Sequence, residues 1–155
     1  MIDAISPTAV DTHTSAPKGP DPHGWYWGTG RRKSAVARAR IKPGNGEFKV
    51  QISRKKFKSI DEHFSEMRDR EDVIAPLKAT KTFGKVDVVV RASGGGFMGQ
   101  AQAIRLAIAR AVKNFDPSTE QALRDNGFLT RDPREVERKK YGQAGARRRF
   151  QFSKR

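Results

Sequence analysis

The last 18 residues of this chain contain eight basic side chains and no acidic one. The segment has two glycines and no apolar stripe, and its charges repel one another, so it cannot form a compact core alone. We interpret it as an extended arm that becomes ordered on a polyanion. At about 3.3 Å per residue, such an arm reaches about 60 Å when fully extended.

The rest of the charge is also unevenly divided. The chain has 155 residues and a net charge of +15. Residues 25–60 carry eleven basic side chains against one acid, whereas residues 61–72 carry six acids against two arginines. We interpret the acidic stretch as a solvated surface with local ion pairs. The overall excess of positive charge predicts a polyanionic partner, with nucleic acid as the first candidate.

The composition excludes several classes of protein and site. The chain has no cysteine, which removes disulfides, thiolate metal sites and cysteine nucleophiles. No apolar run approaches the roughly 18 residues of a membrane-spanning helix. Residues 1–24 are polar, with three aspartates and no arginine, and are predicted to be a disordered acidic extension. They resemble neither a secretory nor a mitochondrial leader, so a cytoplasmic location is expected.

Alternating side chains predict the early strands. In Ser34–Lys42 the alanines and Ile41 share one face, and basic residues occupy the other. After the turn at Pro43–Gly46, Phe48–Ile52 alternates again, so the two segments are predicted to pair as a β-hairpin.

Two further strands are predicted, one before and one after these segments. Trp25–Trp27 is predicted to be a short strand that Gly28-Thr29-Gly30 ends. Val86–Arg91 is an apolar run typical of a buried strand, and Gly94-Gly95-Gly96 ends it.

Apolar residues at helical spacing predict helices at residues 57–64, 73–77, 100–113 and 118–126. Ser118 is the expected N-cap of the last helix, and Gly127 is its expected stop. The order of elements predicts a small α+β domain at residues 25–127, followed by an extended basic tail at residues 128–155.

Motifs typical of enzymes are incomplete here. Gly94–Gly99 fits G-x-G-x-x-G between a strand and a helix, but no second parallel strand and no ribose-binding acid follow. The glycines are either a flexible turn or a set of backbone N–H groups that meets an RNA phosphate. Lys33-Ser34 lacks the glycine of a phosphate-binding loop, and the three histidines are scattered. We therefore predict no enzyme activity, no metal site and no cofactor.

Dense basic segments are the strongest functional signal. The residues predicted to contact nucleic acid from the body of the domain are Arg31, Arg32, Lys33, Arg38, Arg40, Lys42, Arg54, Lys55, Lys56 and Lys58. The tail contributes Arg138, Lys139, Lys140, Arg147, Arg148 and Arg149. Arginine offers bidentate contacts to phosphate, and lysine supplies a point charge. Phe150 and Phe152 are suited either to stacking on bases or to packing in a protein crevice.

Several motifs in order resemble the bacterial-type family of the ninth protein of the small ribosomal subunit. The resemblance covers residues 26–155 and rests on Gly30–Arg38, Gly94–Gly96, Gly99–Ala101, Ala103–Arg105, Ile108–Ala111, Leu129–Asp132, Glu137–Lys140 and the terminal Gln151–Arg155. It implies a structural, non-enzymatic ribosomal protein whose sheet is covered by helices and contains a left-handed βαβ crossover.

The resemblance also implies specific partners. These are ribosomal RNA in the head of the small subunit, neighbouring head proteins, and the anticodon stem-loop of the P-site tRNA at the tail tip. By the same resemblance, Gly95, Gly96, Gln100, Arg105 and Arg131 join the residues expected to contact ribosomal RNA, and Ser153, Lys154 and Arg155 are expected to contact the tRNA. The alternative from another class is a free nucleic-acid chaperone or DNA-compacting protein, which would bind any duplex with a steep dependence on salt.

Overall fold

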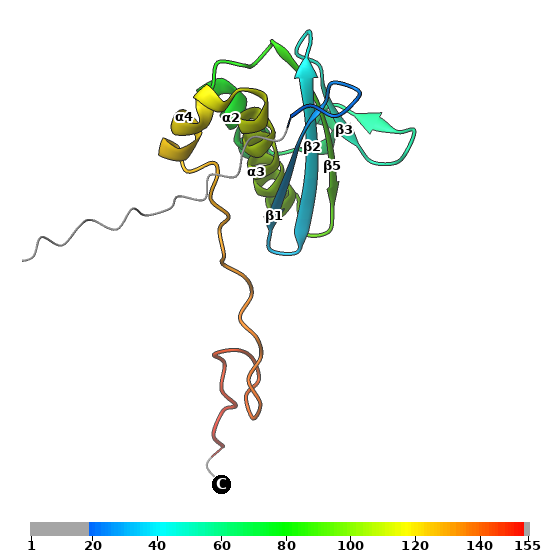
Figure 1. The fold of residues 1–155 in the computed structure, drawn as a ribbon. Helices are drawn as coiled ribbons and strands as arrows, with labels where there is room; N and C mark the ends of the chain where they lie inside the picture. Colours follow the sequence, from blue (N-terminus) through cyan, green and yellow to red (C-terminus); the bar gives the residue numbers. More distant parts are fainter. Residues whose placement is uncertain (1–18, 154–155) are drawn as a thin grey trace, which may run out of the picture.

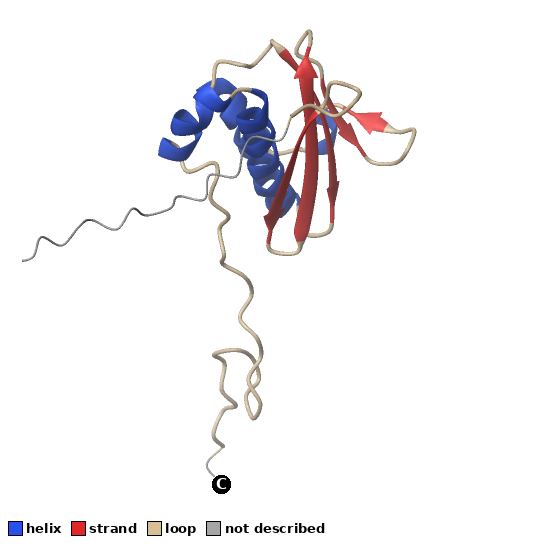
Figure 2. Ribbon diagram, in the orientation of Figure 1, coloured by secondary structure: helices blue, strands red, loops and turns tan. Residues whose placement is uncertain are grey.

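The computed structural model describes residues 19–153 and contains one mixed sheet with helices on one face. The strands are β1 (Tyr26–Arg32), β2 (Ala35–Pro43), β3 (Phe48–Gln51), β4 (Phe57–Lys58) and β5 (Val86–Ser93), in the order β1-β2-β5-β3-β4. The helices are α1 (Ile60–His63), α2 (Met67–Ala79), α3 (Phe97–Phe115), the 3₁₀ turn η1 (Pro117–Thr119) and α4 (Glu120–Asp125). Figure 2 shows α2, α3 and α4 stacked to one side of the sheet. The predicted α+β class is confirmed.

Strand β1 does not stop at its glycines, so that prediction was wrong. It continues through Gly28 and Gly30 to Arg32, pairing in antiparallel fashion with β2. A Cβ atom at Gly28 or Gly30 would lie within 2.6 Å of a backbone nitrogen of α3 and nearer still to an α3 carbonyl oxygen. The glycines therefore serve close helix–sheet packing, because only a residue without a side chain lets the two backbones approach so closely.

The alternation in β2 is confirmed, but its predicted hairpin partner was wrong. Ala35, Ala37, Ala39 and Ile41 are at most 1% exposed. Strand β5 lies between β2 and β3, antiparallel to β2 and parallel to β3. The apolar faces of β2 and β3 suit either arrangement, and inserting the more apolar β5 gives it a strand on both sides.

The hairpin partner of β2 is instead β1. The two-residue turn Lys33-Ser34 joins these strands, with Lys33 at φ 50°. A left-handed residue at this place fits the twist of a tight hairpin, although glycine or asparagine is more usual. The parallel strands β3 and β5 are joined by β4, α1 and α2, which supplies the expected βαβ crossover; its hand stays a prediction.

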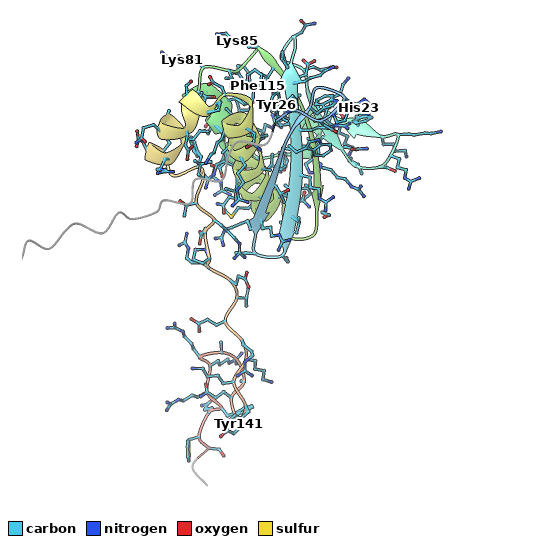
Figure 3. All side chains as sticks on the ribbon, viewed as in Figure 1. His23, Tyr26, Lys81, Lys85, Phe115 and Tyr141 are labelled. Atoms are coloured by element: carbon cyan, nitrogen blue, oxygen red, sulfur yellow. The ribbon has the colours of Figure 1, made fainter. Side chains whose placement is uncertain are left out.

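Helix α3 is the centre of the core and confirms the helix predicted at residues 100–113. It packs on β1 and β2 on one side and on α2 on the other. Figure 1 shows it between the sheet and α2. Because two sides are covered, even residues off the predicted stripe, such as Ala103, Leu106 and Ala109, are buried. At its C-terminal end Phe115 packs edge to face against Tyr26 of β1, with the ring centroids 5.3 Å apart. Figure 3 labels the two residues next to each other.

The helices predicted at residues 57–64 and 73–77 are shifted in the structure. Phe57 lies in β4, and helix begins only at Ile60, capped by the Ser59 hydroxyl. Helix α2 starts at Met67, earlier than its apolar residues suggest, and contains Pro76 in its final turn. Proline has no N–H to donate to the carbonyl four residues earlier, and the helix ends three residues after it, at Ala79. Asp69 of the acidic stretch is buried instead of solvated.

The last helix ends as predicted but begins differently. The Asp116 carboxylate accepts the N–H of Ser118 at 3.0 Å and so caps the 3₁₀ turn η1. Helix α4 follows at Glu120, and its N-cap is Thr119, not Ser118, with no side-chain cap hydrogen bond. Gly127 has φ 69°, its N–H donates to Arg124 O, and the N–H of Phe128 donates to Leu123 O. These two bonds form the Schellman motif that glycine favours at a helix end.

After α4 the described chain contains no further helix or strand up to residue 153. Phe128 and Leu129 still pack against the core, and the following residues run away from the body (Figure 1). The N-terminal extension predicted at residues 1–24 lies largely outside the described residues, as do Lys154 and Arg155. No helix within residues 19–153 is both long and apolar enough to cross a bilayer.

Candidate nucleic-acid interface

The face of the sheet opposite the helices is open and basic. Strand alternation places the cationic side chains on this outer face: Arg31 on β1, Arg38, Arg40 and Lys42 on β2, Lys49 on β3 and Arg91 on β5. The acid on the same face of β5 is Asp87, whose carboxylate lies 4.0 Å from Lys42 Nζ and accepts the N–H groups of Asn45 and Glu47. The predicted face is thus present, with Lys49 and Arg91 added to it.

Tryptophans hold two of these cations in place. The Arg40 guanidinium lies 4.8 Å from the ring centroid of Trp25 and 5.8 Å from that of Trp27. Lys42 Nζ lies 5.0 Å from Trp25. The negative ring faces attract both cations without neutralising them, so the charges stay available to a polyanion.

The β1–β2 turn meets the glycine-rich turn before α3 at one end of the sheet. A cavity of about 250 Å³ lies between them, lined by Lys33, Ser34, Gly95, Gly96 and the start of α3. Gly94 and Gly95 have φ of 74° and 67°, which glycine adopts without strain. A Cβ at Gly94 would lie 2.7 Å from Ser34 O, so the two turns touch.

The start of α3 exposes backbone donors beside this cavity. Gly96 is the N-cap and has no side chain to accept the first N–H groups of the helix. Gln100, predicted to contact RNA, instead donates from Nε2 to Gly94 O at 3.1 Å, and its Oε1 lies 3.1 Å from His63 Nε2. Gln100 therefore shapes the glycine turn. Whether it also touches RNA stays a prediction.

Arg32 points away from the outer face and joins the tail to the body. Its side chain is 10% exposed. Nε donates to Gln102 Oε1 on α3 at 2.7 Å, Nη1 donates to the carbonyl of Arg134, and Nη2 lies 2.9 Å from Asp132 Oδ2. We call this set of contacts the tail-root latch. Each of the three guanidinium nitrogens thus has a partner within the protein, a role that the count of basic residues did not reveal.

The Asp132 carboxylate is suited to this latch. Hydrogen bonds from the Arg134 side chain and backbone, together with the nearby charges of Arg134 and Arg32, hold the pKa of Asp132 well below its usual range. The carboxylate therefore stays ionised near neutral pH. It binds Arg32 on one side and its own tail neighbour on the other.

Two more predicted RNA contacts are engaged within the protein. Arg105 Nη1 lies 2.6 Å from Asp72 Oδ1, and its guanidinium lies 5.8 Å from the ring of Phe128. Arg131 Nη2 lies 2.6 Å from Glu135 Oε1. Arg105, on α3, thus connects α2 to the start of the tail, and Arg131 pairs with another residue of the tail.

The other predicted basic residues are exposed. Arg54, Lys55 and Lys56 occupy the turn between β3 and β4 and have no ion pair within residues 19–153. In the described part of the tail the same holds for Arg138, Lys139, Lys140, Arg148 and Arg149. Arg147 is different, because it lies 2.6 Å from Glu137 and its hydrogen bonds lower the pKa of that carboxyl.

The tail offers cations and aromatic rings in alternation. Tyr141, Phe150 and Phe152 are 98%, 68% and 99% exposed, and Figure 3 shows Tyr141 far from the body. Ser153 is the last described residue and is exposed. Such a segment has the groups to neutralise phosphates and to stack on bases.

The sequence is similar to a known protein family and to individual proteins of the small ribosomal subunit. The chain matches the family described as Ribosomal protein S9/S16 over residues 30–155. It is 51% identical to small ribosomal subunit protein uS9 of Thermotoga neapolitana over 130 residues, which cover 84% of this chain and 96% of the relative. It is 49% identical to the uS9 protein of Anaeromyxobacter dehalogenans over 126 residues, covering 81% and 93%. The chain therefore belongs to the ribosomal protein S9 family, whose members are structural, non-enzymatic ribosomal proteins.

Proposed function

We propose that this protein is built into the head of the small ribosomal subunit in the cytoplasm, where its body binds ribosomal RNA and its tail reaches the P-site tRNA. The observation that carries the proposal is the separation of two cationic regions, the open outer face of the sheet and the tail, on either side of a protein-bonded root. Family membership supports the ribosome as the site of assembly. It also disfavours the free chaperone or DNA-compacting alternative.

The proposal divides the chain into parts with different tasks. Residues 25–127 form the RNA-binding body, and residues 128–155 form the tail that enters the subunit among RNA helices and neighbouring head proteins. Residues 1–24 are an acidic extension to which the proposal assigns no task. The tail-root latch supports this division, because it fixes the place where the tail leaves the body.

The tail tip acts by charge. Lys154 and Arg155 follow the exposed Ser153 and lie outside the described residues. We assign them contacts with the anticodon stem-loop backbone, because a site that accepts every tRNA has to bind phosphate and sugar and leave the bases unread.

Deleting Ser153, Lys154 and Arg155 is expected to weaken P-site tRNA binding while leaving assembly intact. Two phosphate contacts with charged groups correspond to about a tenfold or greater loss of affinity. The measurement is tRNA affinity for purified small subunits containing either chain, with Lys154→Gln/Arg155→Gln as the variant that keeps the length. Normal tRNA affinity in truncated subunits contradicts the tRNA contact.

Replacing both Arg31 and Lys33 by glutamate is expected to impair incorporation of the protein into subunits. Both side chains are exposed at the end of the β1–β2 hairpin, and reversing them sets four units of charge against RNA phosphates. Arg32 between them is left intact because it holds the latch. Competition with the wild-type chain during reconstitution measures the effect, expected at tenfold or more, roughly, from lost phosphate contacts.

The matched control is Lys81→Glu/Lys85→Glu, which makes the same charge change. Both lysines are exposed in the loop between α2 and β5, at the other end of the sheet (Figure 3). Equal incorporation of the two double variants removes the β1–β2 turn from the RNA contact.

A further inference from the structure

Two arginines face each other directly across neighbouring strands of the open face. In the register of β2 and β5, Arg38 is the partner of Arg91. Side chains of directly opposed residues have Cβ atoms about 5 Å apart, and like charges in this position destabilise a sheet. Both arginines are exposed, and neither has an ion pair within residues 19–153. The pair is therefore a local repulsion that no ion pair within the described residues relieves.

The neighbouring residues make this pair a concave site. Arg38 and Arg91 line a cavity of about 350 Å³ with the next pair along the strands, Val36 and Ser93. The hydroxyl of Ser93 is a donor and Val36 forms an apolar wall. Asp87, the acid on the same face of β5, is four residues from Arg91, roughly 13 Å along the strand, and is already bonded to the β2–β3 turn and near Lys42.

We propose that Arg38, Arg91 and Ser93 form a binding site for one backbone phosphate of folded RNA. The inference rests on the proposed function, since it assumes that this face meets ribosomal RNA, and it adds a defined contact centred on Arg91. Two guanidinium groups present planar forks of N–H donors that match the non-bridging oxygens of a phosphodiester. An anion between them turns the cross-strand repulsion into two attractive contacts, and the Ser93 hydroxyl donates a further hydrogen bond.

The site makes opposite predictions for the free and the bound protein. Without RNA, Arg91→Gln removes repulsion, so the isolated chain should melt at the same temperature as the wild type or higher. With RNA, the same change removes one charged contact, and affinity for small-subunit ribosomal RNA should fall about tenfold. The slope of log affinity against log salt should also become shallower, by less than the roughly 0.9 of a fully lost phosphate contact, because Arg38 still binds the phosphate.

The experiment uses the full chain and four variants: Arg38→Gln, Arg91→Gln, the double variant, and Lys85→Gln as control. Lys85→Gln removes one charge in the exposed loop between α2 and β5, at the other end of the sheet (Figure 3). Because both arginines bind one phosphate, the double variant should lose clearly less affinity than the product of the two single losses. An Arg91→Gln chain that binds RNA like Lys85→Gln overturns the site. A double variant whose loss of affinity equals the product of the two single losses also overturns it.

Further arms separate the source of the anion and the type of partner. Melting of the wild type in inorganic phosphate, compared with chloride at equal ionic strength, tests whether the site binds a free anion. If phosphate raises the melting temperature while Arg91→Gln keeps normal RNA affinity, the RNA assignment is overturned. If Arg91→Gln binds RNA normally but is incorporated poorly into subunits, the face contacts a neighbouring protein. That result also overturns the RNA assignment. If the Arg31/Lys33 double variant fails to incorporate while Arg91→Gln behaves as wild type, this site falls and the proposed function stands. If neither change has an effect, both fall.

Discussion

Replacing Gly30 by alanine should lower the free energy of unfolding by more than about 3 kcal/mol, a large share of the roughly 5–15 kcal/mol that stabilises a typical domain. The added Cβ would lie 2.6 Å from Ala107 N and nearer still to Ala103 O. Those are backbone atoms of α3, so no side-chain rotation relieves the overlap, and the helix has to move away from β1. Urea unfolding followed by circular dichroism measures the loss.

Gly99→Ala is the matched control, because it makes the same chemical change at the other side of the contact. Gly99 is in the first turn of α3, and its new Cβ would find only ordinary contacts at 3.7 Å. Removing a helical glycine should raise stability by about 0.5 kcal/mol. Equal effects of the two substitutions would show that the close approach of β1 and α3 is not what requires Gly30.

Replacing Arg32 by methionine should release the root of the tail and lower the free energy of unfolding by about 2 kcal/mol. Methionine keeps an apolar stem of similar length but donates none of the bonds to Gln102, Arg134 and Asp132. The body should still fold, because the core packing of α3 against the sheet is unchanged. In subunits, the effect should resemble tip deletion, with weaker tRNA binding, because the tail leaves the body without a fixed direction.

Spin labels can follow this release directly, since the chain has no native cysteine. Cysteines introduced at the exposed Lys78 in α2 and Val136 in the tail report the distance between body and tail root. The distance distribution should be narrow in the wild type and broad with Arg32→Met. Arg31→Met is the control, because Arg31 is exposed on the other face of β1, and it should change stability by less than about 0.5 kcal/mol. An equally broad distribution in both variants would mean that Arg32 does not hold the tail.

The elements that the sequence predicted well are those whose pattern depends on one local contact surface. Residues 35–41 of β2 alternate because one face of the strand contacts the core. Helix α3 has an apolar stripe because that side of the helix packs on the same face of the sheet. Gly127 was predictable for a similar reason, since a left-handed residue at a helix end favours glycine whatever surrounds it.

The two errors in the sheet have one cause, which is that they concern partners distant in sequence. The alternation of β2 and β3 is the same whether they pair with each other or with β5 between them. Gly28 and Gly30 carry no local sign of the α3 backbone behind them, so a rule for local turns ended β1 too early.

The candidate interface divides in the same way. The uneven charge of the chain was sufficient to predict a polyanionic partner and a tail without a core of its own, because both follow from charge density and apolar content. Which basic residues are available was decided by the tertiary structure. It turned Arg32 inward to Gln102 and Asp132 and set Arg91 opposite Arg38, because strand register and helix packing direct each side chain to one face. Sequence composition alone determines how much positive charge the molecule has, but only packing across the sheet determines where that charge meets its partner.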